Sequence, residues 1–350
     1  MSKFREILLG SRLATAILAS RLGLRRAPFK YLLVVTKKCN SKCRNCLIWT
    51  EKPAQEMTLE EYENLAKASP GLLWLNLTGG EVTLRDDVVE IVRVFKRYCH
   101  KLDILNFTTN GINSEKIIQV VHDLRALDFL QFAVNVSLDG PSDVHDRLRG
   151  VSGNFISAVK TFQRLKQMGV QSFLSFTVYD SNYASFDQMV EHAQLLVPWI
   201  SKRDFHLNLE NSSTHFYGHV RSKGQQDASH LKGKIELLRK FVKETPLSLK
   251  PIDYFKRRYH QLAVRYLKTG RTPIRCKALT NSVYISEHGD LYPCVVWNEK
   301  IGSLRAENFN MDRLTSSPKV RALRDRIDRR QCQNCWTPCE AYHSLLLEPL

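Results

Sequence analysis

The hydrophobic positions of this 350-residue chain fall into short apolar runs that alternate with longer amphipathic stretches. From residue 31 onward the short runs are rich in β-branched and aromatic residues and predict strands, while the stretches between them have helical spacing. We expect strands at Tyr31–Thr36, Leu73–Leu77, Ile104–Thr108, Phe132–Leu138, Ser172–Val178 and Phe205–Leu209. We expect helices at Thr58–Ala68, Arg85–Tyr98, Ser114–Leu124, Ile156–Met168 and Phe186–Leu196.

The regular alternation of strand and helix predicts an α/β fold built from parallel βαβ units. Two helices carry opening signals: Thr58 precedes Glu60 and Glu61, and Ser114 precedes Glu115. Right-handed crossovers between the strands are compatible with a partial barrel and with a doubly wound sheet. The pattern alone leaves both architectures open.

The chain changes character after residue 211 and suggests a second, smaller unit. A polar stretch is followed by helical patterns at Leu231–Val242 and Tyr254–Thr269, and a group of cysteines begins at Cys276. We therefore expect an N-terminal extension over 1–30, a main domain over 31–225, a helical linker over 226–274 and a cysteine-rich domain over 275–350.

The first 23 residues are rich in Leu, Ile and Ala but are interrupted by Arg5, Arg12 and Arg21. No uncharged stretch of 18 apolar residues occurs, so a membrane-spanning helix is not expected. The basic residues lie inside and after the apolar part, which makes a poor signal peptide. The segment is predicted to be a loosely amphipathic helix that either packs on the main domain or lies on an anionic membrane surface.

The net charge is +17, from 52 basic and 35 acidic residues, which is high for an enzyme. Such a balance favours an anionic neighbour, either a phosphorylated substrate, a nucleic acid or an acidic membrane, although a diffuse solvating charge gives the same total. Eight of the nine cysteines fall into two tight groups, and Cys99 stands alone as an expected buried thiol. Spacings this short suit metal or cluster binding better than disulfides, so a reducing, cytoplasmic compartment is expected.

The first cysteine group is Cys39, Cys43 and Cys46, directly after the first predicted strand. Three thiolates within eight residues can all face one ion or cluster. A tetrahedral zinc site needs a fourth ligand, and none follows nearby. A four-iron cluster held by three cysteines keeps one iron open to bind something else.

The next three predicted strands also end in loops that suggest a ligand site. The second ends in Thr78-Gly79-Gly80-Glu81, the third in Thr108-Thr109-Asn110-Gly111, and the fourth in Ser137-Leu138-Asp139-Gly140, followed by Val144–Gly150. Each loop alone is ordinary turn chemistry. Because the carboxyl ends of parallel strands lie on one edge, we expect the loops to gather beside the cysteines.

These motifs together resemble the radical S-adenosylmethionine (SAM) superfamily. The resemblance rests on CxxxCxxC after the first strand, Gly-Gly-Glu after the second, Thr-Asn-Gly after the third and Ser-Leu-Asp-Gly after the fourth. The stretch Val144–Gly150 and Gly153-Asn154-Phe155 is similar to the branch with C-terminal SPASM or twitch cluster domains, and the similarity spans about residues 31 to 340. It implies a partial (β/α)6 TIM-type barrel followed by a small cysteine-rich α+β domain.

The resemblance also assigns roles to residues. Cys39, Cys43 and Cys46 would hold a [4Fe–4S] cluster whose open iron binds SAM. Its reductive cleavage would give a 5′-deoxyadenosyl radical that takes hydrogen from a substrate. The SAM contacts that the resemblance implies are Gly79, Gly80, Glu81, Asn110, Ser137, Asp139, Thr177 and Asn182. No residue is assigned to catalysis of the later steps.

Two positions depart from the usual pattern of the family. Asn45 stands before the third cysteine, where an aromatic residue commonly packs near adenine, and Trp49 is expected to take a related place. Val82 replaces the proline that often follows Gly-Gly-Glu. These changes affect the expected adenine contacts and leave the family resemblance intact.

The second cysteine group predicts one further cluster. Cys276 and Cys294 flank a predicted β-hairpin that turns at His288-Gly289-Asp290, and Cys332, Cys335 and Cys339 lie at the start of a short terminal helix. Five thiols are too few for the two auxiliary clusters of a full SPASM domain, so one auxiliary [4Fe–4S] cluster is expected. Its ligands would be Cys276, Cys294, Cys332 and Cys335, with Cys339 as a spare or a replacement. A structural zinc site is the alternative.

The substrate is left open by the sequence. A small molecule, a lipid or a phosphorylated intermediate fits the basic charge and the N-terminal helix slightly better than a peptide, whose maturation is the alternative. A zinc- or cluster-containing nucleic-acid-binding protein is the non-enzymatic alternative. For the enzyme, the expected partners are a reductant such as flavodoxin or ferredoxin and, as an option, the inner face of an anionic membrane, with no nucleic acid.

Overall fold

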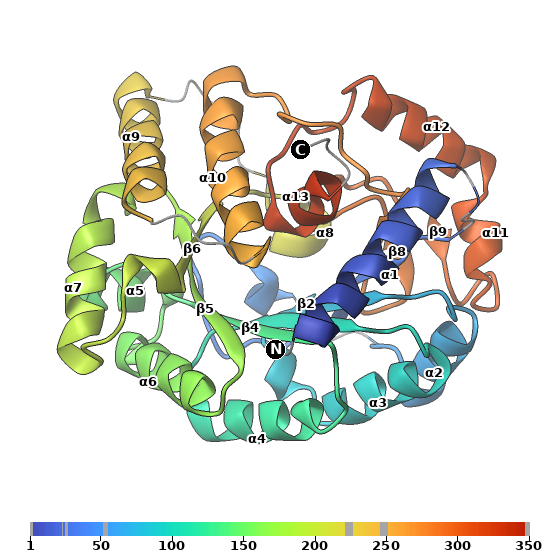
Figure 1. Ribbon diagram of the computed structural model, residues 1–350, viewed down its shortest axis with the longest axis horizontal. Coiled ribbons are helices and arrows are strands. Elements are labelled where there is room, and N and C mark those ends of the chain that lie inside the picture. The colour runs from blue at the N-terminus through green and yellow to red at the C-terminus, as the bar shows by residue number, and fades with distance from the viewer. Residues whose placement is uncertain are drawn as a thin grey trace.

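Six parallel strands form the centre of the computed structural model, which describes residues 3–22, 24, 27–51, 55–220, 227–245 and 251–346. The strands are β1 (Lys30–Thr36), β2 (Trp74–Gly79), β3 (Ile104–Thr109), β4 (Gln131–Ser137), β5 (Gln171–Val178) and β6 (Phe205–Leu209). They pair in the order in which they occur along the chain, and β6 forms an edge of the sheet. The structure is therefore an open partial barrel, which confirms the α/β fold expected from the sequence (Figure 1).

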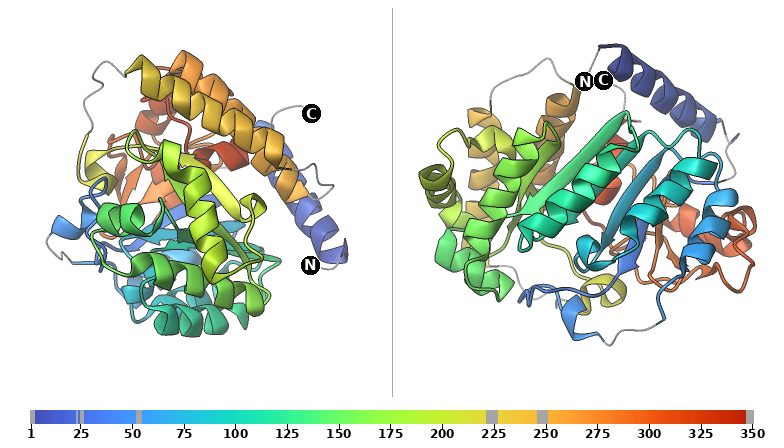
Figure 2. Two further views of the ribbon diagram at one scale, coloured as in Figure 1. Left: turned by 90° about the vertical axis from the view of Figure 1, so that its left-hand side faces the viewer. Right: turned by 90° about the horizontal axis from the view of Figure 1, so that it is seen from below.

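Helices between the strands cover the outer side of this curved sheet (Figures 1 and 2). They are α2 (Leu59–Lys67), α3 (Val88–Tyr98), α4 (Ser114–Arg125), α5 (Ser142–Arg149), α6 (Asn154–Gln167) and α7 (Phe186–Leu196). Short 3-10 turns accompany them at Ile48–Thr50, Val82–Leu84, Tyr183–Ser185 and Lys202–Asp204. The apolar faces of the helices pack on the strands in one continuous core.

The opening signals of two helices differ in their outcome. Thr58 caps α2 as predicted, because its hydroxyl accepts the Glu61 amide and the Glu61 carboxylate accepts the Thr58 amide. For α4 the predicted opening residue, Ser114, is one position too late to be the N-cap. Asn113 is its N-cap, with a side chain that accepts the Lys116 amide, and Ser114 is the first helical residue.

The C-terminal part extends the same sheet. Strand β7 (Ser282–Ile285) pairs in parallel with β1, so that Tyr31 lies opposite Val283 and Leu33 opposite Ile285. Strands β8 (Asp290–Tyr292) and β9 (Gly302–Ser303) add antiparallel pairs beyond β7. The predicted hairpin with its turn at residues 288–290 is confirmed. The helices that follow are α11 (Met311–Thr315), α12 (Pro318–Asp328) and α13 (Pro338–Leu345).

The predicted helices after residue 227 are also present, as α9 (Ala228–Glu244) and α10 (Pro251–Thr269), after the short α8 (Thr214–Tyr217). Helix α10 packs against α9, α13 and β6. The main core includes residues of the barrel strands, of β7 and of α13. The division of the chain into four segments remains a prediction.

The N-terminal segment forms α1 (Lys3–Arg21), which packs on the face of the barrel turned toward the viewer in Figure 1 and projects beyond the body in the left view of Figure 2. Arg5 pairs with Asp128 at 2.9 Å, and Arg12 pairs with Asp103 at 2.6 Å. Ala16 is buried against Phe29 in a small cluster. Among the described residues, none of the helices has the length and apolar character that crossing a membrane requires.

Candidate functional site

The loop of Cys39, Cys43 and Cys46 follows β1 and lies against the Gly-Gly turn at the end of β2. The Gly80 amide donates to the Thr36 carbonyl at 2.8 Å, and the Glu81 amide donates to the Lys38 carbonyl at 2.9 Å. A Cβ atom on Gly80 would come within 2.1 Å of the Lys38 carbonyl oxygen. Gly79 has φ of +140° and is equally close to Thr36. These two glycines are therefore required by the close approach of the cysteine loop.

Glu81 joins the second and third strand ends. One carboxylate oxygen accepts the Thr83 hydroxyl at 2.7 Å and the Thr109 hydroxyl at 2.9 Å, and the other accepts the Asn110 amide at 2.8 Å. The side chain is 2% exposed. Burial raises the pKa of Glu81, and the hydrogen bonds from Asn110 and the threonines oppose that rise. The carboxylate thus fixes the relative position of two rim loops.

Asn110 ties the third strand end to the cysteines. Its side-chain amide donates to the Asn40 side chain, between Cys39 and Cys43, at 2.7 Å. Its oxygen accepts the Ile112 amide at 3.0 Å, which holds the turn that contains Gly111. Asn110 therefore acts as a direct link between the cysteine loop and β3.

The fourth strand end is organised by an ion pair between Asp139 and Arg149. Asp139 accepts the Thr177 amide at 2.8 Å on one oxygen and pairs with Arg149 on the other. Arg149 also lies 3.8 Å from the Cys43 sulfur through Nη1. Burial alone would lower the pKa of Arg149, but the charges of Asp139 and Cys43 raise it. A permanent positive charge is thereby held beside the cysteines.

The backbone of α5 supports the same loop. The amides of Lys42 and Arg44 donate to the carbonyls of Arg149 and Leu148 at 2.9 and 3.0 Å. Gly150 ends the helix with φ of +66°, and a Cβ there would lie 2.6 Å from the Lys42 carbonyl. The sequence analysis quoted this stretch only as part of a pattern and missed Arg149. The signal available in the sequence was a basic residue ten positions after Asp139, which could have indicated a partner for that carboxylate.

The remaining predicted SAM contacts lie near Asp139. Ser137 is buried at the end of β4. The Asn182 side chain donates to the carbonyls of Asp139 and Thr177 at 2.8 and 2.9 Å and accepts the Tyr179 amide at 2.7 Å. Asn182 and Thr177 thus hold the Asp139 loop in place. All eight predicted SAM contacts lie at or just beyond the carboxyl ends of β2 to β5.

The three cysteines are only partly exposed. Burial raises the pKa of Cys39 to about 11 and that of Cys46 to about 12, while Arg149 opposes both shifts. Trp49 donates its indole N–H to the Cys43 carbonyl at 3.3 Å and remains at the surface. No three His, Cys, Asp or Glu side chains in the described part of the chain converge as ligands of a single metal ion do. A cubane is compatible with this geometry, since each cysteine binds a different iron.

In the second cysteine group, four cysteines influence one another and the fifth, Cys339, lies apart from them. Burial raises the pKa values of Cys276, Cys294 and Cys335, and neighbouring thiols raise them further: Cys294 and Cys332 act on Cys276, and Cys276 and Cys332 act on Cys335. The four thiols of Cys276, Cys294, Cys332 and Cys335 therefore lie within electrostatic reach of one another. Cys332 and Cys335 precede α13, and only Cys339 lies on it.

Cys339 points into the barrel. Its sulfur lies 4.0 Å from the Asn76 side chain on β2, and Lys30 on β1 donates to its carbonyl. Lys30 is almost fully buried, with its ammonium 4.0 Å from the centre of the Trp74 ring. Burial lowers the pKa of Lys30. This position is compatible with Cys339 being the spare thiol of the second group, which remains a prediction.

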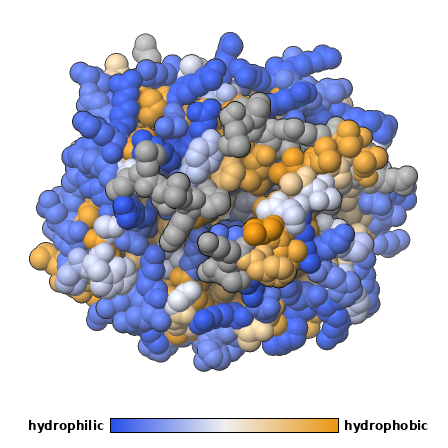
Figure 3. Space-filling view, in the orientation of Figure 1, coloured by the Kyte–Doolittle hydropathy of each residue, from blue (hydrophilic) through white to orange (hydrophobic). Residues whose placement is uncertain are grey.

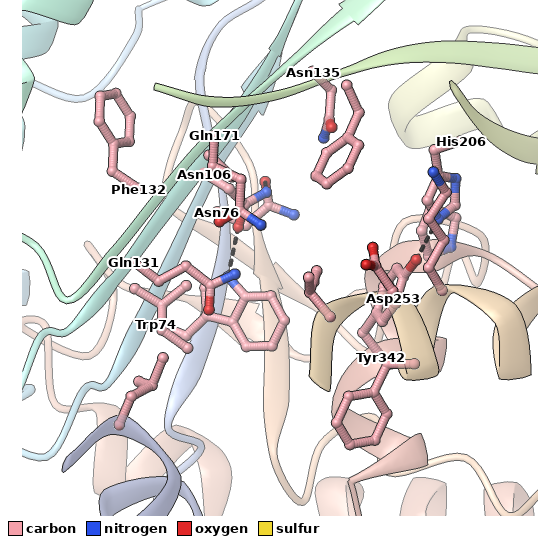
Figure 4. A pocket seen from close by; sticks show the side chains of 18 of the residues that line it. Trp74, Asn76, Asn106, Gln131, Phe132, Asn135, Gln171, His206, Asp253 and Tyr342 are labelled. Atoms are coloured by element: carbon pink, nitrogen blue, oxygen red, sulfur yellow. Dashed lines mark hydrogen bonds between the residues drawn. The ribbon is translucent and has the colours of Figure 1, made fainter. Parts of the chain in front are cut away.

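A cavity of about 1920 Å³ fills the barrel interior below the rim. It extends from residues at the amino ends of the strands, such as Gln131 and Gln171, to Thr78, Thr108 and Asn208 near the carboxyl ends. Figure 4 shows Trp74, Asn76 and Asn106 on one side of it, across from His206 and Tyr342. His206 and Tyr342 are hydrogen-bonded to each other, and burial lowers the pKa of His206 to about 3, so its ring is neutral. Sequence reasoning did not identify this cavity.

Comparison with known families matches this arrangement. Residues 33–193 match the radical SAM superfamily, and residues 276–336 match the iron-sulfur cluster-binding domain known as SPASM. The chain belongs to the radical SAM superfamily. As a member it is a SPASM-type radical SAM protein, whose cofactors are a [4Fe–4S] cluster and SAM together with auxiliary iron–sulfur. The donor set fits these groups, since each of the two regions supplies at least three thiols that can face one cluster.

Two curated relatives come from Bacillus subtilis (strain 168). The antilisterial bacteriocin subtilosin biosynthesis protein AlbA is 23% identical over 318 residues, which cover 88% of this chain and 64% of AlbA. The sporulation killing factor maturation protein SkfB is 26% identical over 168 residues, which cover 47% of this chain and 39% of SkfB. The chain thus spans less than two thirds of the length of these relatives.

Among solved structures, Streptococcus suis SuiB bound to S-adenosylmethionine superimposes with a TM-score of 0.60. The match has 15% sequence identity and covers 85% of this chain and 68% of SuiB. At this identity the likeness concerns the fold. It supports the assignment of an α/β partial barrel followed by a C-terminal extension.

Proposed function

We propose that this chain is a radical SAM enzyme that cleaves SAM reductively and removes a hydrogen atom from a substrate held in the barrel cavity. One observation carries the proposal: the Cys39–Cys46 loop is hydrogen-bonded to the rim loops of β2 and β3, and its backbone to α5, above a cavity inside the barrel. Cys39, Cys43 and Cys46 would hold the cluster. When bound, the reduced cluster and SAM supply a 5′-deoxyadenosyl radical that abstracts hydrogen, leaving methionine and 5′-deoxyadenosine.

The residues of the chain position these groups and exclude water. Glu81 and Asn110 hold the loops of β2 and β3 against the cysteine loop, which keeps the three thiols that would bind the cluster in one arrangement. Arg149 lies 3.8 Å from the Cys43 sulfur, so its positive charge would offset part of the negative charge of a cluster held there. Asp139 and Ser137, at the carboxyl end of β4, are proposed to contact SAM from the rim.

We assign Cys276, Cys294, Cys332 and Cys335 to one auxiliary [4Fe–4S] cluster. The mutual effect of these thiols on their pKa values supports the set. Cys339 is proposed to line the substrate cavity instead, because its neighbours are Lys30 and Asn76. A cluster next to α13 would lie behind the wall of the cavity, where it could exchange an electron with a bound substrate.

The test is anaerobic reconstitution of the full chain followed by iron analysis and incubation with SAM and dithionite. We expect about eight iron atoms per chain and formation of 5′-deoxyadenosine. The triple variant C39A/C43A/C46A should lose about half of the iron and all 5′-deoxyadenosine. Cys99→Ser, which changes a buried thiol away from both groups, is the matched control. A colourless, zinc-loaded protein that forms no 5′-deoxyadenosine would overturn the proposal.

Peptide maturation is the second candidate function. The observation that favours it is the similarity to AlbA, a bacteriocin biosynthesis protein, and to SkfB, a killing factor maturation protein. A peptide reaction is distinguished from a small-molecule or lipid reaction by an extract of cells separated into peptides, small molecules and lipids. The fraction that supplies the hydrogen atom found in 5′-deoxyadenosine contains the substrate.

A further inference from the structure

Helix α1 exposes large apolar side chains on its outer side. Phe4 is 72% exposed, Ile7 71%, Leu18 57% and Leu22 62%, and Leu24 just beyond the helix is 72% exposed. Figure 3 shows this apolar surface along α1, near both of its ends. The helix is nevertheless fixed to the barrel by Arg5 and Arg12. A firmly held helix with an apolar outer face indicates a surface that is covered by a partner.

The same helix forms one wall of the barrel cavity. Leu9, Leu13 and Ile17 line the cavity, and Leu18 belongs both to its lining and to the exposed apolar surface. The apolar outer face is therefore continuous with the inside of the cavity through α1. An apolar molecule at the outer face of α1 can therefore enter the barrel cavity along apolar side chains.

The cavity lining mixes apolar and polar side chains. Near α1 the apolar Phe129 and Phe132 lie beside the polar Gln131 and Gln171. A deep zone toward the carboxyl ends of the strands is lined by amides from adjacent strands, Asn76, Asn106, Asn135 and Asn208. Such a lining suits an amphiphile, which has both apolar and polar groups.

The amides of the deep zone bond to one another and to neighbouring side chains. Asn106 donates to Asn76 at 3.0 Å and accepts the Trp74 indole, and Asn208 donates to Ser175 at 2.6 Å. The side-chain oxygen of Asn208 is buried beside the His206 ring. These amides can bond to a polar group of a bound molecule, such as a hydroxyl group.

The cavity mouth carries excess positive charge. Arg125 donates to the Met168 carbonyl and Arg257 to the carbonyls of Val242 and Thr245, which are neutral partners that leave the charge in place. Seven of the cavity-lining side chains are Lys or Arg and four are Asp or Glu. Two of the seven, Lys30 and Lys256, are buried inside, and Arg5 and Lys166 pair with Asp128 and Asp204, so the excess charge at the mouth comes from Arg125, Arg203 and Arg257. The chain as a whole carries +17. A basic rim around an apolar surface is complementary to an anionic bilayer.

We propose that α1 and the basic rim dock on an anionic membrane, and that the substrate is a membrane lipid that enters the cavity along α1. Its hydrocarbon chain would lie against Leu9, Leu13 and Ile17, and its hydroxyl-bearing polar part would reach the amides, below the rim that carries the cysteines. The assignment of a substrate rests on the proposed function, whereas the docking surface does not.

The docking surface is tested with reconstituted full-length protein and vesicles in a sedimentation assay. We expect binding to vesicles of phosphatidylcholine mixed with phosphatidylglycerol, weaker binding to phosphatidylcholine alone, and loss of binding in high salt. Phe4→Ser combined with Ile7→Ser should weaken binding at least about ten-fold, because both side chains are exposed and neither lines the cavity. The matched control, Leu195→Ser with Ile156→Ser, removes exposed apolar side chains from α7 and α6 and should bind normally.

Absence of binding, or equal effects of the two double variants, would overturn the docking surface. Helical circular dichroism and iron content report whether each variant is folded, so a folded Phe4/Ile7 variant with full binding also counts against it.

The lipid substrate is tested by deuterium transfer. Cells of the source organism are grown in deuterated medium, and their total lipid, as vesicles, and their aqueous extract are each incubated with the enzyme, SAM and dithionite. We expect deuterium in 5′-deoxyadenosine from the lipid alone. Label from the aqueous extract alone, which contains peptides and phosphorylated metabolites, or from neither would overturn the lipid assignment. If no 5′-deoxyadenosine forms at all, the proposed function fails instead.

Discussion

Single side chains at the rim join strand ends that are far apart in the sequence. Glu81 accepts hydrogen bonds from the β3 end, Asn110 reaches the cysteine loop, and Arg149 lies between Asp139 and Cys43. These side chains are mostly buried, so each bond acts in a medium where an unpaired partner is expensive. The precision of the site therefore depends on a few polar residues.

Arg149→Met should strongly destabilise the protein. It leaves the buried Asp139 carboxylate without its cation, which typically costs about 3–5 kcal/mol of unfolding free energy. Arg147→Met, on the same helix with a half-exposed side chain, is the matched control and should cost less than about 1 kcal/mol. Denaturant titration of both variants measures the difference. Equal effects would mean that the Asp139–Arg149 pair contributes little.

Cys339→Ser should retain the full iron content, whereas Cys335→Ser should lose about four irons per chain. The reason is that Cys335 lies among the other thiols, while Cys339 faces Asn76 and Lys30. Iron analysis after anaerobic reconstitution makes the comparison. Loss of iron in Cys339→Ser with retention in Cys335→Ser would exchange their roles.

The sequence predicted which residues gather at the rim better than it predicted what each one does. Motif spacing after each strand was sufficient to locate Gly79, Glu81, Asn110 and Asp139, because parallel strands end at one edge. The orientation of Cys339 depends on how α13 packs against the barrel, and local spacing carries no information about that. Arg149 was missed for a related reason, since its partner is ten residues away and fixed only by the turn into α5.

At the scale of elements, the strands and most helices follow directly from the apolar pattern. The ends of the predicted strands differ from those of β1–β5 by at most two residues and agree with those of β6, and α9 and α10 extend their predicted spans. Helices α5, α8, α11 and α12 were not predicted. Helix α5 is only eight residues long and strongly charged, so its apolar period is too short to detect. The error at Asn113 arose because two adjacent residues are both good caps.

The packing of α10 on β6 should make stability fall in acid. His260 on α10 accepts the Leu207 amide of β6 at 3.1 Å, and burial lowers its pKa well below the usual 6.5. The unfolded chain then binds a proton that the folded chain resists. The stabilisation is complete above pH 6.5 and is lost as the pH falls below it, by roughly 1.4 kcal/mol per pH unit for each such histidine.

His260→Gln, which keeps an acceptor, should reduce this loss between about pH 7.5 and about pH 5.5. His122→Gln, at an exposed position of α4, should leave the slope unchanged. Denaturant midpoints of the holoenzyme at the two pH values provide the measurement. An unchanged slope in His260→Gln would contradict the assignment.

At the scale of the molecule, the pairing of β7 with β1 joins the two cysteine regions in one sheet. Sequence reasoning separated them as domains, because nothing in the apolar pattern reveals that a strand 250 residues away extends the same sheet as β1. Residues of both regions also share one hydrophobic core. The two regions are therefore expected to unfold together.

Native-state hydrogen exchange should show the same opening free energy for the amides of β1 and β7, within about 1 kcal/mol. Val283→Ala, at a buried position opposite Tyr31, should lower both by about 2 kcal/mol. Val220→Ala, at an exposed site, is the control and should change neither. If β7 exchanged through an opening of its own, the C-terminal part would be an independent unit.

Because β1 carries the first cysteine loop at its carboxyl end and pairs with β7 along its side, the spacing of the two cysteine groups is set by rungs of hydrogen bonds. Helix α10 adds to that spacing, because Tyr259 and Tyr266 donate to the carbonyls of Trp336 and Asn334 in the segment that carries Cys332 and Cys335. Helix α9 instead contributes Phe241 and Val242 to the cavity wall. Exchanges in α9 can therefore remodel the cavity while β1, β7 and α10 keep the separation of the two cysteine groups constant, which makes α9 the natural place for new substrate preferences to evolve.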